Sequence, residues 1–133
     1  AGLSYFEFDS MELSEGTPWT DSFPAIFLER KGYEIEKYLP VLAGWDIKNS
    51  TERFRYDFKQ TVSDQLIYSH YQTGSEFLKK YHAELVSESG GPGPPIWDTC
   101  PVDALKALGS VSVPRGEFWI KHRNMFLIKE VSS

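Results

Sequence analysis

The sequence predicts an α/β fold in which about three parallel strands are covered by helices, as in part of a (β/α)8 TIM barrel. Three short runs have strand character, at residues 4–9, 83–87 and 110–113. Helical patterns separate them, and the order βααβαβ favours parallel strands joined by crossovers. Three strands cannot close a barrel. We therefore expect residues 1–133 to form a single incomplete barrel segment, which belongs to a larger chain or completes its sheet with a partner.

The N-terminal elements have recognisable boundaries. Residues 4–9 alternate aromatic and polar side chains, as in a half-buried strand. Thr20 is a candidate N-cap for the first helix, and Gly32 fits the position just after its end. A short second helix is expected over residues 34–43, ended by Gly44. Trp45 follows that glycine, and we expect it to pack against the helix end.

A long helix is the strongest pattern in the chain. Thr51 can cap it, and apolar residues then recur every four positions at Phe54, Phe58, Val62 and Leu66. The pattern continues to about residue 82, although Gly74 could kink or break it. The stripe lacks a heptad, which favours a helix covering a barrel over a coiled coil. A further short helix is expected over residues 101–108, with a glycine just past its end.

Composition narrows the class of protein. The net charge is −5, and no basic run appears, so we expect no nucleic-acid partner. No apolar stretch is long enough to span a bilayer, so we expect no membrane segment. Cys100 is the only cysteine, which excludes an intrachain disulfide and a thiolate metal cluster. Aromatic residues make up 15% of the chain, which fits either a large aromatic core or rings that line a sugar-binding cleft.

Carboxylates follow the predicted strands. Asp9 and Glu12 come after the first strand, Glu88 after the second and Glu117 after the third. Because barrel active sites lie at the carboxyl ends of the strands, we expect these four groups to cluster at one edge of the sheet. Glycosidic cleavage needs one carboxyl group to protonate the leaving oxygen and another to activate water or attack the sugar. The alternative is that some of them only hold loops by accepting backbone N–H bonds.

Aromatic residues and one histidine lie near these loops. An exposed indole can stack on a sugar face, and three tryptophans are in or beside loops that follow strands: Trp19, Trp97 and Trp119. His122 follows the Glu117 loop and could reach a substrate, or it could be a surface histidine. The three histidines show no zinc-ligand spacing.

Six segments, in order along the chain, resemble the catalytic domain of glycoside hydrolase family 106, the α-L-rhamnosidases. They are GTPWT (16–20), RKGY (30–33), YLPVLAG (38–44), RFRYDF (53–58), GGP (90–92) and GEFW (116–119). The resemblance implies a (β/α)8 barrel, an inverting mechanism with two carboxylates, and a carbohydrate substrate. It also allows for calcium dependence, and it implies a bacterial parent enzyme that is periplasmic or secreted. The family's enzymes are several times longer than this chain.

The resemblance also assigns roles. The Asp-x-x-Glu pattern of the family falls on Asp9 and Glu12, and its later strand-end glutamate falls on Glu117, with Glu88 the competing choice. Glu12 is then the general acid and Glu117 the base. Asp9 would orient the acid, bind a sugar hydroxyl or help to hold calcium. The alternative function is a non-catalytic carbohydrate-binding or assembly module, and open sheet edges would favour self-association.

Overall fold

We describe residues 2–11, 13, 16–89, 101–117 and 126–133 of a computed structural model. The chain divides into two compact units, residues 1–14 with 64–133, and residues 15–63. We call the first the sheet unit and the second the helical unit, and we describe each by itself. The strands in chain order are β1 (Tyr5–Phe8), β2 (Glu84–Ser87) and β3 (Val113–Pro114). The α-helices are α1 (Phe23–Lys31), α2 (Leu39–Leu42), α3 (Thr51–Leu66), α4 (Thr73–Lys79), α5 (Ala104–Leu108) and α6 (Phe126–Ser132).

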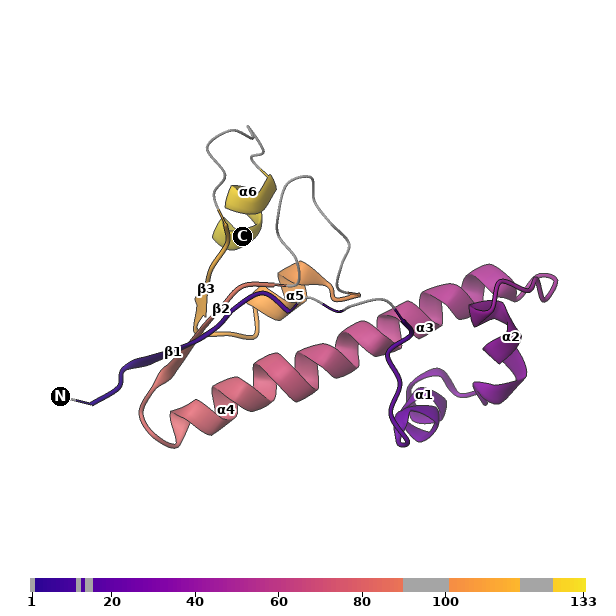
Figure 1. The fold of residues 1–133 in the computed structure, drawn as a ribbon, viewed down its shortest axis with the longest axis horizontal. Helices are drawn as coiled ribbons and strands as arrows, with labels where there is room; N and C mark the ends of the chain where they lie inside the picture. The colour runs from indigo at the N-terminus through magenta and orange to yellow at the C-terminus, as the bar shows by residue number, and fades with distance from the viewer. Residues whose placement is uncertain (1, 12, 14–15, 90–100, 118–125) are drawn as a thin grey trace. The chain divides into compact units, whose positions relative to one another are not determined.

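The three strands form one parallel sheet in the order β1-β2-β3 (Figure 1). The register pairs Phe8 with Ser87, and Ser87 with Pro114. The expected α/β class with three parallel strands is therefore confirmed. β3 is only two residues long, and the predicted strand at 110–113 lies mostly before it. Ser110 and Val111 still belong to the turn after α5, since their N–H groups donate to the carbonyls of Ala107 and Leu108.

Close packing fixes the sheet unit around β1. Leu85 of β2 is fully buried with Leu78 and Ala83, and Phe8 packs against this cluster. A Cβ atom on Gly74 would lie 2.7 Å from Cε2 of Phe8, so only glycine allows α4 to come this close. The ring of His70 also lies against Phe8, with a centroid distance of 4.6 Å. Phe8 is thus held immediately before Asp9.

The helical run that begins with α3 contains a π-helix, Ile67–Gln72, before it continues as α4. Gly74, which could have kinked or broken the run, lies inside α4. Two hydroxyls bond to carbonyls near the widened turn: Thr73 donates to the carbonyl of Tyr68 at 2.8 Å, and Ser69 donates to that of Gln65 at 2.7 Å. Within the π-helix, the buried residues Ile67 and Tyr71 pack against Ala107.

An aromatic cluster forms the core of the helical unit. Phe23 and Phe27 of α1 are buried against Phe54 and Phe58 of α3, with centroid distances of 5.5 Å for Phe23–Phe58 and 5.9 Å for Phe27–Phe54. Gly32 ends α1 in the left-handed conformation (φ 77°), and its N–H donates to the carbonyl of Leu28. The glycine stop is confirmed as expected.

Three expectations for the helices are corrected. The residue just before the first helix is Ser22 and not Thr20, its side chain makes no capping hydrogen bond, and Pro24 occupies the first turn. The second helix is not continuous over 34–43: a 3-10 helix, Glu36–Tyr38, precedes the four-residue α2, because Pro40 cannot donate a backbone hydrogen bond within it. Trp45 does not pack, since 70% of its surface is exposed. α6 was not expected at all.

Candidate functional site at the carboxyl edge of the sheet

The parallel register brings polar residues to one edge of the sheet. Asp9 follows β1, Glu88 follows β2 and Arg115 follows β3, each directly after a strand. Backbone hydrogen bonds extend past the strands: the N–H of Glu88 donates to the carbonyl of Phe8 at 3.4 Å, and that of Arg115 donates to Ser87 at 2.9 Å. The three residues therefore lie side by side where parallel strands end.

Glu88 is the most buried of these groups, with 1% of its surface exposed. One carboxylate oxygen, Oε1, lies 3.4 Å from Nε of Arg115. The other, Oε2, is buried and has no hydrogen-bond partner among the residues that the structure describes. Arg115 is shared, because it also forms an ion pair with Glu7 of β1. Glu88 is thus a buried carboxyl group with one paired oxygen and one open oxygen.

Burial raises the pKa of Glu88 above its ordinary value, and the negative charges of Glu117 and Asp9 raise it further. The ion pair with Arg115 acts in the opposite direction, since a nearby cation favours the charged form. Burial and the two carboxylates outweigh it, so the net direction is upward. Asp9 and Glu117 are thus close enough to Glu88 for their charges to act on it.

The catalytic roles chosen from the sequence stay predictions. Of the residues chosen, Asp9 and Glu117 are close enough to Glu88 for their charges to raise its pKa. Trp19 belongs to the helical unit, where its ring lies 5.3 Å from that of Phe23 and 43% of its surface is exposed. Four other predicted site residues lie outside the described part of the chain: Glu12, Trp97, Trp119 and His122. Cys100 lies outside it too.

Two supporting residues at this edge were not chosen from the sequence. Glu7 carries the second ion pair of Arg115, and the hydroxyl of Ser87 donates to the backbone carbonyl of Glu88 at 2.9 Å. Strand alternation could have indicated Glu7, because residues two positions apart in a strand point to the same face, and Glu7 lies two positions before Asp9. The pairing of Arg115 with Glu88 depends on strand register, which the sequence does not specify.

The described residues do not contain a ready metal site. No group of three or more His, Cys, Asp or Glu side chains among them is arranged to hold a metal ion. The carboxylates at the sheet edge therefore do not by themselves amount to a calcium site. Nor does any helix in the described ranges have the length and apolar character needed to cross a bilayer.

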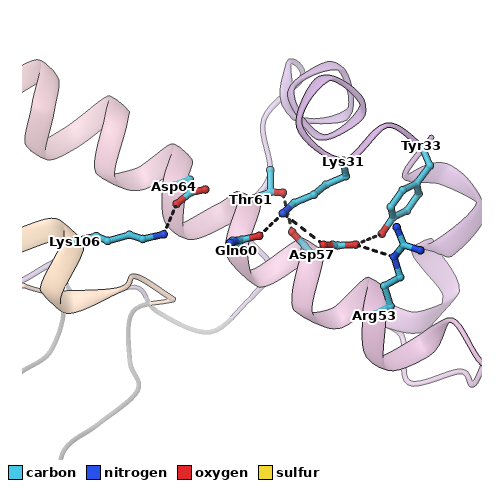
Figure 2. A network of polar contacts seen from close by, with 8 residues as sticks. All are labelled: Lys31, Tyr33, Arg53, Asp57, Gln60, Thr61, Asp64 and Lys106. Atoms are coloured by element: carbon cyan, nitrogen blue, oxygen red, sulfur yellow. Dashed lines mark hydrogen bonds and ion pairs between the residues drawn. The ribbon is translucent and has the colours of Figure 1, made fainter.

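A second set of charged residues lies in the helical unit and surrounds Asp57 of α3 (Figure 2). The hydroxyl of Tyr33 donates to Oδ2 at 3.0 Å, Nε of Arg53 lies 3.6 Å from the same oxygen, and Nζ of Lys31 lies 3.5 Å from Oδ1. Lys31 also donates to Gln60. Burial, followed by the hydrogen bond and the charge of Asp57, raises the pKa of Tyr33 to about 12, so this phenol stays protonated.

A parallel sheet with acidic side chains at its carboxyl edge is the arrangement in which barrel enzymes place their catalytic groups. The profile of the alpha-L-rhamnosidase family, glycoside hydrolase family 106, matches residues 1–131. The chain therefore belongs to this family, as the six sequence segments predicted.

Two relatives illustrate the similarity. A protein of Formosa agariphila, provisionally named a beta-glucuronidase, is 30% identical over 113 residues, which are 84% of this chain and 9% of that protein. The structure of a rhamnosidase from Novosphingobium sp. PP1Y matches with a TM-score of 0.68 and 24% identity, over 81% of this chain and 10% of that one. The chain thus spans about a tenth of the length of either relative, and the second match supports the fold.

Proposed function

We propose that the protein acts in the inverting hydrolysis of α-L-rhamnosides and uses two carboxylates at the carboxyl edge of its sheet. The observation that carries the proposal is the buried, protonation-prone Glu88 next to Asp9 and Glu117, in a chain that belongs to an α-L-rhamnosidase family. A pair of carboxyl groups with different proton affinities is what glycoside hydrolysis requires.

The geometry favours Glu88 as the group that holds a proton. A general acid must stay protonated near its working pH, and the raised pKa of Glu88 provides that condition. Glu12 was the choice from sequence, and it remains the competing acid. Glu117 is the proposed base, and Asp9 binds a sugar hydroxyl or orients the acid.

The proposed reaction follows from these roles. Glu88 donates its proton to the glycosidic oxygen as the bond from that oxygen to the anomeric carbon breaks. Glu117 takes a proton from a water molecule as its oxygen bonds to the opposite face of the same carbon. In an inverting enzyme the two carboxyl groups stand roughly 6.5–9.5 Å apart, which leaves room for the water.

The full protein is proposed to complete a (β/α)8 barrel around this sheet. The outward side chains of β1 support this, because 56% of Tyr5 and 48% of Phe6 is exposed on a strand that occupies one edge of the sheet. An edge strand with exposed apolar residues tends to be covered or paired. Without such cover, self-association is the expected alternative.

Calcium dependence is kept as a proposal that needs a separate test, since no described cluster of donors fits the ion. Hydrolysis should be assayed before and after chelation, and again after calcium is restored. A reversible loss of turnover would support a calcium requirement. Unchanged turnover in chelator would remove calcium from the proposal.

Leaving-group dependence tests the roles of the carboxylates. Glu88→Gln should lower turnover of an alkyl α-L-rhamnoside by at least about 10²-fold, but should affect a 2,4-dinitrophenyl rhamnoside much less, because that leaving group needs no proton. Glu117→Gln should impair both substrates by a similar factor. Glu12→Gln is the comparison: if it gives the pattern expected of Glu88→Gln, the acid is Glu12. If no variant affects turnover, the catalytic carboxylates lie elsewhere. If the wild-type protein binds sugar but shows no turnover, a carbohydrate-binding module replaces the hydrolase.

A second substrate class is favoured by one relative, the provisionally named beta-glucuronidase. The same two carboxylates could serve a β-glucuronide. The protein should therefore be assayed on chromogenic α-L-rhamnosides and β-glucuronides in parallel. Faster turnover of the glucuronide would correct the proposed substrate and leave the carboxylate chemistry unchanged.

A further inference from the structure

A surface pocket in the helical unit has no role in the chemistry proposed above. Its volume is about 260 Å³, and it is lined by Lys31, Gly32, Tyr33, Tyr38, Ser50, Arg53 and Phe54. This is slightly below the range of pockets that hold drug-sized ligands, so it suits a single small ring. Gly32 leaves one wall open, because a Cβ atom on this residue would meet nothing within 4 Å.

The positive charge of the pocket is concentrated on Arg53. Lys31 is mostly buried and already bonded to Asp57 and Gln60. Arg53 is paired with Asp57 through Nε at 3.6 Å, and 76% of its side chain is exposed. Its terminal amino groups donate no hydrogen bond to the residues that the structure describes. A guanidinium with two parallel N–H donors left open matches a carboxylate in a bidentate pair.

The arginine is held in place rather than left to move freely. Its guanidinium carbon lies 5.8 Å from the centre of the Tyr33 ring, within the range of a cation–π contact. The hydroxyl of Tyr33 is fixed by its bond to Asp57. The group that would bind an anion is therefore partly oriented before the ligand arrives, which reduces the entropy lost on binding.

Aromatic rings supply the rest of the wall. Tyr38 stacks on Phe54 with a centroid distance of 5.3 Å and an interplanar angle of 18°. Tyr33 meets Tyr38 edge to face at 5.1 Å. Rings of this kind offer apolar contact to the C–H face of a sugar, while the arginine offers a charge at the rim. Lys31 and Arg53 against Asp57 leave one net positive charge, which suits one carboxylate better than a doubly charged phosphate.

We propose that this pocket binds an acidic sugar residue, a uronic acid, with the carboxylate on Arg53 and the ring against the tyrosines. The site would recognise a charged unit of a polysaccharide and take no part in bond cleavage. Its occupancy does not depend on the activity of the sheet edge, so binding can be measured in a protein that is inactive.

The test is titration of the protein with galacturonate and glucuronate, and with galactose and glucose as their neutral counterparts. Binding is followed by calorimetry and by shifts of the tyrosine ring signals in NMR spectra. We expect at least one uronate to bind about tenfold or more tightly than its neutral counterpart, as a charge-assisted hydrogen bond allows. Equal binding of the neutral sugar, or binding of inorganic phosphate as tight as that of the uronate, would overturn the proposal.

Matched variants locate the site. Arg53→Gln should reduce uronate affinity by about tenfold or more. Arg53→Lys should give an intermediate loss, because lysine keeps the positive charge but lacks the two parallel N–H donors of the guanidinium. Arg55→Gln is the control on the same helix, since Arg55 pairs with the exposed Glu52 and does not line the pocket. Circular dichroism checks that each variant is folded. Unchanged uronate affinity in a folded Arg53→Gln variant would also refute the proposal.

Discussion

The surroundings of Glu88 in the sheet unit and of Asp57 in the helical unit differ in one respect. Both carboxylate oxygens of Asp57 have partners. Tyr33 donates a hydrogen bond to Oδ2, Arg53 pairs with the same oxygen, and Lys31 pairs with Oδ1. Glu88 has one cation on one oxygen, an open second oxygen, and two carboxylates nearby. A buried charge that is fully paired stabilises the fold. A buried ionisable group with like charges beside it is destabilising, and such groups are typical of functional sites.

The largest effect is expected where the contrast is strongest, at Glu88. Glu88→Gln should lower turnover by at least about 10²-fold. Above the raised pKa of Glu88 it should also stabilise the fold by about 0.5–2 kcal/mol, because the variant then removes a buried charge at a functional site. Thermal unfolding and turnover of the same preparation check both halves. A variant that loses stability as well as activity would show that Glu88 is structural.

The stability gain of that variant should depend on pH. Because the folded-state pKa of Glu88 lies above its ordinary value of 4.5, the folded wild type binds this proton more tightly than the unfolded chain does. Wild-type stability is then lost as pH rises from 4.5 through the raised pKa. The difference in melting temperature between variant and wild type should be small at pH 4 and larger at pH 8.

The next largest effect is expected at Asp57. Asp57→Ala removes a carboxylate whose side chain is 14% exposed and leaves Lys31 and the Tyr33 hydroxyl without it, so the helical unit should lose about 2 kcal/mol. Glu52→Ala is the control, since Glu52 is 86% exposed and pairs with Arg55. That variant should change stability by less than about 0.5 kcal/mol. If chemical denaturation gives both variants the same loss of unfolding free energy, Asp57 stabilises the helical unit no more than an exposed carboxylate does.

A smaller effect is expected at the contact between α4 and β1. Gly74→Ala should destabilise the sheet unit by about 1 kcal/mol, because the added methyl group collides with Phe8 and this strain exceeds the gain in helix preference. Phe8→Leu combined with Gly74→Ala should relieve part of the collision. A double-mutant cycle in denaturant measures this coupling, and additive effects would mean that the two residues do not meet.

The smallest effect is expected for Lys106 and Asp64, a solvent-exposed ion pair at 3.5 Å within the sheet unit. Lys106→Met should change stability by about 0.5 kcal/mol or less, and the difference should vanish in high salt. A larger and salt-insensitive loss would show that this pair resembles the Asp57 network more than an ordinary surface pair.

Much of the sheet edge could be predicted from the sequence, for a physical reason. Parallel strands end at the same edge, so polar residues that follow strand-like runs are expected to lie near one another. That reasoning put Asp9 and Glu88 side by side without knowledge of the register, although Arg115, and not Glu117, directly follows β3. It did not separate their roles, because proton affinity depends on burial and on neighbours that only the packed chain defines. Glu88 was a secondary choice until its burial was known.

The helical unit was less accessible to sequence reasoning. Gly32 gave a clear stop signal, and the four-residue spacing of Phe54 and Phe58 gave the buried face of α3. The pocket was missed because Lys31 and Arg53 are far apart in sequence and neither forms a motif with the other. The π-helix was missed for a different reason: its residues have ordinary helical preferences, and one extra residue per turn leaves no mark in composition.

That π-helix has a consequence for how the chain can change over generations. A widened turn stores one residue more than an α-helix of the same rise, and each residue turns a helix by about 100°. Deleting one residue within Ile67–Gln72 would therefore restore a regular helix of the same rise, and α4 would keep its rotation, with Gly74 still facing Phe8. A deletion inside α4 itself would turn the residues after it by about 100°. Single-codon deletions should therefore be tolerated better in the widened turn than in α4.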